Sequence, residues 1–101
     1  MNRIDPLALA ELIRKEEHFL LDVREPSEHK HFNIGGSLVP LGNLMKEAGT
    51  IPRNLPVIVY CKKGIRSQIA IQRLESKFGF TNLINLHGGM EAWKKIFPQT
   101  E

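Results

Sequence analysis

Short apolar runs that alternate with helical segments constrain the fold of this chain more than any other feature. The run Val57–Tyr60 is rich in β-branched and aromatic residues and contains no charge, which is typical of a buried strand. Similar runs lie at Phe19–Val23 and Leu83–Leu86. A weaker run at Ser37–Leu41 is limited by Pro40. Because uncharged strands separated by helices favour parallel pairing, the pattern predicts an α/β domain. We expect a mostly parallel sheet of four to five strands with helices on both faces.

The segments between these runs carry helix signals. Asp5 is a good N-cap, Pro6 suits the first helical position, and Gly79 is a plausible C-terminal stop. Apolar residues at helical spacing, among them Ile71, Leu74 and Phe78, are expected to face the core. The predicted helices are Pro6–Lys15, a short one capped by Ser27 and running to Phe32, Asn43–Ala48, Arg66–Phe78, and a last one that carries Met90, Trp93 and Phe97 and stops at Pro98.

Length and charge limit the class of protein. A chain of 101 residues fits one compact domain, so we expect a single domain over residues 1–101. The net charge of +3 is spread among acidic residues, without a run of like charges or interleaved aromatics, which argues against nucleic-acid binding. The sequence shows neither a signal-peptide pattern nor an apolar run of the roughly 18 residues that a membrane helix needs. We expect a cytoplasmic monomer that does not bind a membrane.

The only cysteine, Cys61, follows the strongest predicted strand and precedes a predicted helix. In parallel sheets, ligands bind beyond the carboxyl ends of the strands. The helix N-terminus and the charges of Lys62, Lys63 and Arg66 would favour a thiolate, and Gly64 would let the loop fold tightly so that its amides converge on one anion. We therefore predict a nucleophilic cysteine, against the simpler alternative of an inert buried thiol.

The spacing around Cys61 bears on what the thiolate would attack. Tyrosine-type cysteine phosphatases need Cys-x5-Arg, whereas Cys61 and Arg66 form Cys-x4-Arg, followed by Ser67. The smaller ring suits a single sulfur better than a phosphate. The histidines could supply a base, but the sequence places none of them beside Cys61, and we expect surface or turn positions for His18, His29, His31 and His87. One cysteine also argues against a disulfide framework or a cysteine-based zinc site.

Four segments stand out along the chain, at Leu20–Glu28, Asn33–Leu41, Val57–Ser67 and Leu86–Trp93. Together they resemble the single-domain rhodanese-like sulfurtransferases. The first resembles the family's "LIDVREPxE" strand and turn, the second its next turn and strand, the third its active-site loop, and the fourth its closing "LxGGxxAW". Each is a weak signal alone, but the four in this order span about residues 20 to 95 and are highly specific.

The second segment departs from the commonest family pattern. Many members read "GHIPGAxxIP" where this chain has Phe32–Pro40, so the histidine and the first proline are missing and the segment is one residue shorter. The chain instead resembles a subset that includes domains fused to activating enzymes of ubiquitin-like proteins. This departure bears on the partner more than on the fold.

The resemblance implies a small rhodanese-like domain with sulfurtransferase activity and no metal or organic cofactor. Cys61 would take a sulfane sulfur from a donor such as thiosulfate and pass it, through a persulfide, to cyanide, a thiol or a partner protein. The loop residues Lys62, Lys63, Gly64, Ile65, Arg66 and Ser67 would hold the persulfide and attract a small anionic donor. Asp22 and Arg24 match a family pair whose role is mainly structural, and Trp93 would pack in the core.

Other functions remain open from the sequence. A rhodanese-like module can bind partners or sense redox state without catalysis, and a sensor thiol would form a sulfenic acid or an intermolecular disulfide. A persulfide carrier that docks on a protein donor or acceptor is a close variant of the enzyme. A phosphatase or arsenate reductase is disfavoured by the short loop between Cys61 and Arg66.

Overall fold

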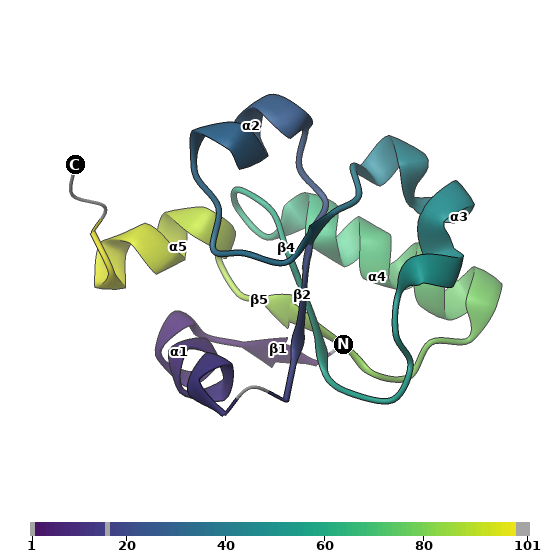
Figure 1. Cartoon of the computed structure of the whole chain (residues 1–101), viewed down its shortest axis with the longest axis horizontal. Coiled ribbons are helices and arrows are strands. Elements are labelled where there is room, and N and C mark those ends of the chain that lie inside the picture. Colours follow the sequence, from purple (N-terminus) through teal and green to yellow (C-terminus); the bar gives the residue numbers. More distant parts are fainter. Residues whose placement is uncertain (1, 16, 99–101) are drawn as a thin grey trace.

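A computed structural model describes residues 2–15 and 17–98 of the chain. Its centre is a parallel five-stranded sheet in the order β1-β5-β4-β2-β3 (Figure 1). The strands are β1 (Arg3–Ile4), β2 (Phe19–Asp22), β3 (Ser37–Leu38), β4 (Val57–Tyr60) and β5 (Leu83–Leu86). The expected α/β fold with a parallel sheet is therefore confirmed.

Helices fill the connections between the strands. They are α1 (Pro6–Arg14), α2 (Pro26–His31), α3 (Leu44–Glu47), α4 (Ile65–Phe78) and α5 (Gly89–Ile96), and short 3-10 turns at Leu41–Asn43 and Ala48–Thr50 flank α3. The N-cap predicted for α1 is confirmed, because Asp5 Oδ1 accepts a hydrogen bond of 2.8 Å from the Ala8 amide. Gly79 ends α4 in the left-handed region, at φ 69°.

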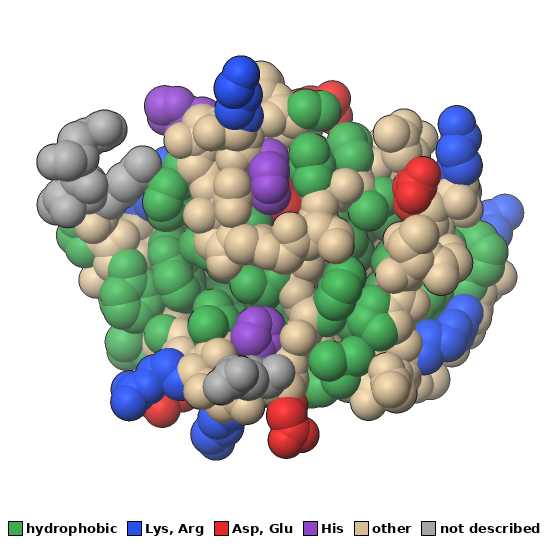
Figure 2. All heavy atoms as spheres, viewed as in Figure 1, with side chains coloured by type: hydrophobic (Ala, Val, Ile, Leu, Met, Phe, Trp, Pro, Cys, Tyr) green, Lys and Arg blue, Asp and Glu red, His purple; other side chains and the backbone are tan. Residues whose placement is uncertain are grey.

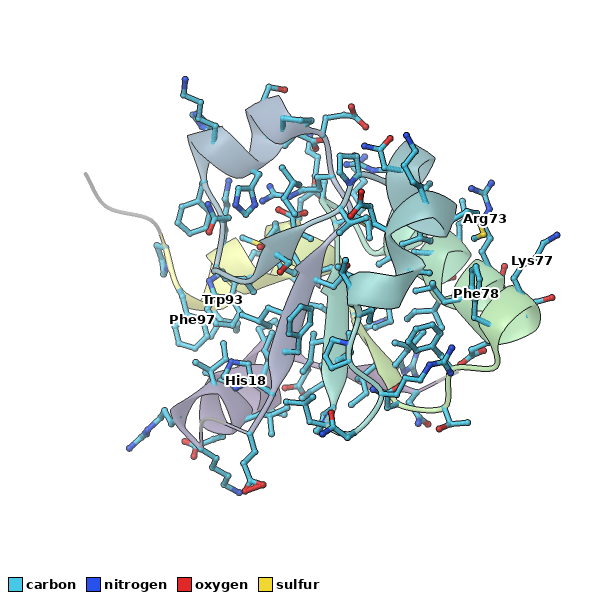
Figure 3. All side chains as sticks on the ribbon, turned by 45° about the vertical axis from the view of Figure 1, so that its right-hand side comes forward. His18, Arg73, Lys77, Phe78, Trp93 and Phe97 are labelled. Carbon is cyan, nitrogen blue, oxygen red and sulfur yellow. The ribbon has the colours of Figure 1, made fainter. Side chains whose placement is uncertain are left out.

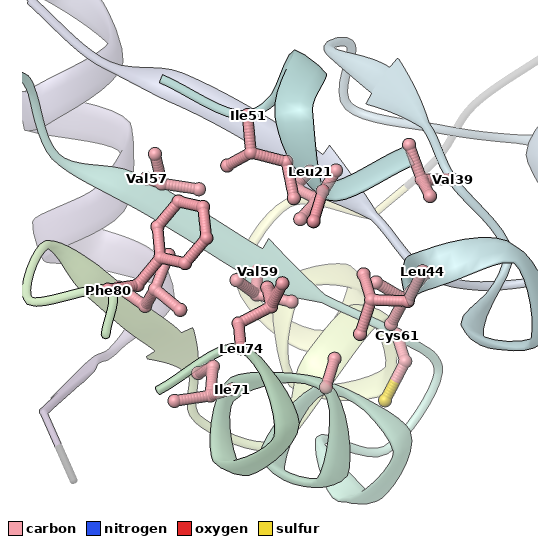
Figure 4. Close-up of a cluster of buried hydrophobic side chains, with 14 residues drawn as sticks. Leu21, Val39, Leu44, Ile51, Val57, Val59, Cys61, Ile71, Leu74 and Phe80 are labelled. Carbon is pink, nitrogen blue, oxygen red and sulfur yellow. The ribbon is translucent and has the colours of Figure 1, made fainter. Parts of the chain in front are cut away.

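The two faces of the sheet carry two separate hydrophobic clusters. Leu21, Val57 and Val59 face α3 and α4, whose Leu44 and Leu74 complete a cluster that also includes Cys61 (Figure 4). The alternate residues Leu20, Ile58 and Tyr60 face the other way and pack with Leu9 of α1 and Met90 of α5. Since successive side chains of a strand point to opposite faces, each buried strand serves both clusters.

The C-terminal aromatic residues lie at the edge of the second cluster. Trp93 is partly buried against it, as expected, and its ring centroid lies 4.6 Å from that of Phe97 (Figure 3). Phe78 differs from the prediction, because it is 39% exposed at the last turn of α4.

Three local predictions need correction. β1 was not predicted, because two residues carry no periodicity, yet it pairs with β5. The expected strand Ser37–Leu41 shrinks to β3, and Pro40 instead precedes a 3-10 turn. The cap of α2 is Glu25 with Pro26 at the first position, so Ser27 lies inside the helix; the Glu25 amide donates to Glu28 Oε2 at 2.9 Å.

The turn between α2 and β3 has a conformation that favours glycine at positions 35 and 36. Asn33 bridges it, since its side chain donates to the His29 carbonyl and accepts from the Gly35 amide, each at 2.8 Å. Gly35 and Gly36 both have positive φ, and a Cβ at Gly36 would overlap the Leu20 carbonyl. The turn therefore packs directly against β2.

The surface is mixed in character. In the face shown in Figure 2, apolar side chains lie across the middle, and charged side chains gather toward the rim. Within residues 2–15 and 17–98, the helices are all too short or too polar to cross a membrane.

Candidate active site

Cys61 directly follows β4, at the carboxyl edge of the sheet. It is a free thiol, buried to 1% exposure. Its Sγ accepts hydrogen bonds from the Gly64 amide at 3.1 Å and from the Ser67 amide at 3.4 Å. These two donors lie on either side of the start of α4, so the sulfur occupies the inside of the loop, where backbone dipoles converge on it.

The loop depends on Gly64 for its shape. Gly64 has φ 91°, a left-handed conformation that L side chains rarely adopt, and it is the residue from which α4 starts. A Cβ there would lie 3.2 Å from the Gly88 amide nitrogen. The loop therefore turns tightly and packs against the chain between β5 and α5.

The start of α5 holds the loop from behind. The amides of Met90 and Glu91 donate to the carbonyl oxygens of Cys61 and Lys62, at 2.8 and 2.9 Å. Helix N-termini leave such amides without partners inside the helix, and here the loop supplies them. Gly89 permits this close approach, because a Cβ at that position would lie 2.5 Å from the Cys61 carbonyl oxygen.

Asn85 of β5 joins the two halves of the loop and was not predicted as a site residue. It is 2% exposed, and its Nδ2 donates to the Gly64 carbonyl at 3.4 Å. The Ser67 hydroxyl donates to Asn85 Oδ1 and lies 3.5 Å from Cys61 Sγ. The available signal was a polar residue inside the apolar run Leu83–Leu86. Buried polar groups need partners, and Asn85 finds both of its partners in the loop.

Arg66 points to α2 and pairs with Glu28. Its two terminal nitrogens donate to the two carboxylate oxygens at 2.8 and 2.9 Å. The hydrogen bond from Arg66 lowers the pKa of Glu28 to about 2, and the same bond raises the pKa of Arg66. The pair balances the charge of Arg66, so the free positive charge at the loop comes mainly from Lys62 and Lys63, whose side chains are exposed.

Asp22 and Arg24, which the resemblance gives a mainly structural role, form an ion pair at the end of β2. The Nε and a terminal nitrogen of Arg24 donate to the two Asp22 oxygens at 2.9 and 2.8 Å, and both residues are buried. Burial acts to lower the pKa of Arg24, but the hydrogen bond and charge of Asp22 raise it overall. Arg24 also donates to the Phe32 carbonyl, and His29 Nδ1 lies 2.8 Å from Asp22 Oδ2. These contacts fix α2 beside the loop.

Tyr60 connects β4 to the glycine turn on the opposite face of the sheet. Its hydroxyl donates to the Gly35 carbonyl at 2.9 Å, and Arg24 lies 5.5 Å above its ring. Burial raises the pKa of Tyr60 well above the ordinary value, so the phenol stays protonated as this donor.

A small pocket of about 140 Å³ opens at the loop and is lined by Cys61, Lys62, Lys63, Ile65 and Arg66. The structure thus brings together most of the predicted loop residues around one recess, with Gly64 and Ser67 beneath it as amide donors. A small anion entering this recess would meet two exposed ammonium groups and then the sulfur.

The histidines lie elsewhere in the described part of the chain. His29 contacts Asp22, His31 and His87 are exposed, and His18 is partly buried near Trp93 and Phe97 (Figure 3). None of them hydrogen-bonds to Cys61 among the contacts of residues 2–15 and 17–98. In that same part of the chain, no three histidine, cysteine or carboxylate side chains gather in a way that could hold a metal ion.

The arrangement at Cys61 can stabilise negative charge on a sulfur and on an atom attached to it. Two amides point to the sulfur, lysines flank the opening, and Asn85 and α5 hold the loop rigid. Preorganised donors of this kind favour a charge that develops during a reaction. The chemistry that fits is nucleophilic attack by the thiolate on a small anionic electrophile.

Known proteins of similar sequence include sulfurtransferases. The family described as "Rhodanese-like domain" matches residues 5–96. The thiosulfate sulfurtransferase GlpE of Coxiella burnetii is 31% identical over 100 residues, which cover 98% of this chain and 92% of that protein. The adenylyltransferase and sulfurtransferase MOCS3 of Drosophila virilis is 31% identical over 106 residues, but this chain spans only 24% of its length.

A solved structure shows the same fold. The rhodanese-related protein of Thermoplasma volcanium superposes with a TM-score of 0.84 at 28% sequence identity, over 95% of this chain and 93% of that one. The family match covers nearly the whole chain, and the GlpE relative matches over nearly its full length. The chain belongs to the rhodanese-like domain family.

Proposed function

We propose that this protein is a sulfurtransferase that moves a sulfane sulfur from thiosulfate, or a similar small anionic donor, to a thiophilic acceptor through a persulfide on Cys61. The observation that carries the proposal is the position of the Cys61 sulfur. The sulfur accepts hydrogen bonds from the Gly64 and Ser67 amides, and Cys61 lines a small recess together with the exposed Lys62 and Lys63.

In the first half of the reaction, the Cys61 thiolate attacks the outer sulfur of thiosulfate. A new sulfur–sulfur bond forms on Cys61, the old one breaks, and sulfite leaves with the bonding electron pair. The total charge is unchanged, and the persulfide keeps one negative charge on its terminal sulfur. Lys62 and Lys63 would attract the dianion and stabilise the sulfite as it leaves.

In the second half, the acceptor attacks the terminal sulfur. Cyanide would leave as thiocyanate, and a thiolate would leave as a persulfide; in both cases Cys61 departs with the electron pair and returns to the thiolate. The persulfide intermediate divides one difficult transfer into two easier ones, and the reaction needs no cofactor. A protein donor or acceptor is compatible with the same steps, because the loop is exposed at Lys62 and Lys63.

The test is the intact mass of the reduced protein after incubation with thiosulfate, for wild type and Cys61→Ser. The proposal expects a gain of one sulfur, about 32 Da, in wild type only, and its loss when cyanide or a thiol is added. A second incubation with a protein persulfide covers a donor other than thiosulfate. Failure to load sulfur from either donor would contradict the proposal and favour a binding module, or a redox sensor if mild peroxide converts Cys61 to a sulfenic acid or a disulfide.

A further inference from the structure

A second, larger pocket lies next to the recess at Cys61. It has a volume of about 260 Å³, and Lys62 lines both cavities. The Arg66–Glu28 ion pair also connects them, since Arg66 lines the small recess and Glu28 lines the larger pocket. A molecule in the larger pocket would therefore lie beside the place where the persulfide forms.

The charged groups of this pocket are not all available to a ligand. Arg24 is paired with Asp22 and Glu28 with Arg66, both at 2.8 Å. Lys62, Lys94 and Glu91 line the pocket as well, and none of them takes part in an ion pair in the described part of the chain. The free charge therefore consists of two ammonium groups against one carboxylate, which favours a ligand with a single negative charge.

The rest of the lining consists of the exposed His31 and two apolar side chains. Phe32 and Met90 contribute to the wall, and the Lys94 ammonium lies 5.2 Å from the centroid of the Phe32 ring. This contact places the end of the Lys94 side chain over the apolar wall. A few methylene groups could lie on that wall with an anionic group at Lys94.

We propose that this pocket, called here the acceptor pocket, binds a small thiol that carries a carboxylate and presents it to the Cys61 persulfide. The proposal rests on the proposed function, because the thiol is the acceptor of the second half-reaction. The carboxylate lies near Lys94, the carbon chain lies on Phe32 and Met90, and the thiolate lies toward Lys62. The acceptor thiolate forms a bond to the terminal sulfur, the bond from that sulfur to Cys61 breaks, and Cys61 leaves as the thiolate.

The first experiment measures the second half-reaction alone. Wild type, Lys94→Gln and Lys95→Gln are loaded with thiosulfate, desalted, and mixed at low salt with 3-mercaptopropionate or with the neutral 2-mercaptoethanol. The loss of about 32 Da is followed by mass. We expect Lys94→Gln to slow transfer to 3-mercaptopropionate about two- to fivefold, as for an exposed ion pair, and to leave transfer to 2-mercaptoethanol unchanged.

Lys95→Gln is the matched control, since it removes the same charge from the neighbouring position of α5, which does not line the pocket. Each variant is compared with wild type for the same thiol, so the intrinsic reactivities of the two thiols cancel. The proposal is overturned if Lys94→Gln slows both thiols equally, slows neither, or behaves like Lys95→Gln. A reduced dithiol protein that accepts sulfur faster than both small thiols, without dependence on Lys94, would also overturn it.

A binding measurement separates this proposal from the proposed function. 3-Hydroxypropionate has the carboxylate but no thiol, and 1-propanol lacks both. Titration of the isotope-labelled protein with 3-hydroxypropionate should shift the amide signals of Phe32, Met90 and Glu91 in wild type, less in Lys94→Gln, and not with 1-propanol. Shifts in a protein that fails to load sulfur would uphold the pocket and contradict the sulfurtransferase. Absence of shifts in a protein that does load sulfur would contradict the pocket alone.

Discussion

The carboxylate of Glu28 and the guanidinium of Arg66 form a two-point ion pair between residues 38 positions apart, which joins the first turn of α2 to the first turn of α4. Glu28 also accepts a hydrogen bond from the Glu25 amide, so one side chain both caps α2 and holds the loop that follows Cys61. The helix that covers the loop is therefore tied to it by charge more than by packing, since α2 has no buried residue.

The Glu28–Arg66 pair predicts a pH-dependent loss of stability. The pKa of Glu28 is lowered from 4.5 to about 2, so its contribution is complete above about pH 4.5 and is lost as the pH falls toward 2. We expect Glu28→Gln to lower the free energy of unfolding by about 1 kcal/mol at pH 7, and by much less at the lowest pH where the fold persists. Urea titrations at several pH values measure this difference. Glu75→Gln, an exposed change in α4, controls for net charge, and a constant difference across pH would contradict the prediction.

Replacing Asp22 should lower the free energy of unfolding much more than replacing Glu28 does. Replacing it with asparagine leaves the buried Arg24 guanidinium without its negative partner, which typically costs about 3–5 kcal/mol. Urea unfolding of Asp22→Asn should show this loss. Asp5→Asn is the control, because asparagine caps a helix as well as aspartate does and should change the free energy by a few tenths of a kcal/mol at most. Equal losses of stability in the two variants would contradict the stabilising role of the Asp22–Arg24 pair.

Replacing Asn85 should change the reactivity of Cys61 as well as the stability of the protein. In Asn85→Leu, the Ser67 hydroxyl and the Gly64 carbonyl lose their buried partner, at a cost of about 1–3 kcal/mol. We also expect the rate of persulfide formation per folded molecule to fall about tenfold, because the amides of the same two residues hold the Cys61 sulfur. Intact mass after rapid mixing with thiosulfate gives the rate.

Asn82→Leu provides the matched control for Asn85→Leu. Its side chain donates to the Pro52 and Leu55 carbonyls, away from the loop, so it should lower stability without changing the rate per folded molecule. If both asparagine variants keep the wild-type rate, Asn85 has a purely structural role.

A side chain at position 89 should displace the loop, because Gly89 lies against the backbone of Cys61 and Lys62. A Cβ in Gly89→Ala would lie 2.5–2.7 Å from backbone atoms of Cys61 and Lys62, and φ is +60°. We expect a loss of about 1–3 kcal/mol and slower sulfur loading, because the backbone of the loop must move. Gly42→Ala meets nothing within 4 Å and should stay within about 0.5 kcal/mol of wild type. Thermal unfolding and sulfur loading of both variants test this, and an unaffected Gly89→Ala would show that the loop tolerates displacement.

The sequence was sufficient to predict the sheet, most of the helices and the position of Cys61. Apolar strands and capped helices are local signals, and parallel pairing places Cys61 at the carboxyl edge. The same signals could not define β1, because a two-residue strand depends entirely on its partner β5. Ser27 was wrongly predicted as a cap, because Pro26 fits the first helical position and the cap therefore falls on Glu25.

The contacts that shape the site were harder to predict because they join residues far apart in the chain. Arg66 was expected to add free charge, and only the folded chain shows that Glu28 balances it. Asn85 was predicted only as a strand residue, since its role depends on the loop that folds over it. Sequence patterns therefore locate Cys61 at the edge of the sheet, while the groups that hold its loop depend on tertiary structure.

The two outermost strands of the sheet, β1 and β3, are only two residues long. An exposed strand edge offers unpaired amides and carbonyls to which another chain can add, and short edge strands leave little length for such pairing. The four-residue strands β2, β4 and β5 lie inside the sheet, with a neighbouring strand on each side. The arrangement thus leaves little strand edge to which a second molecule could add.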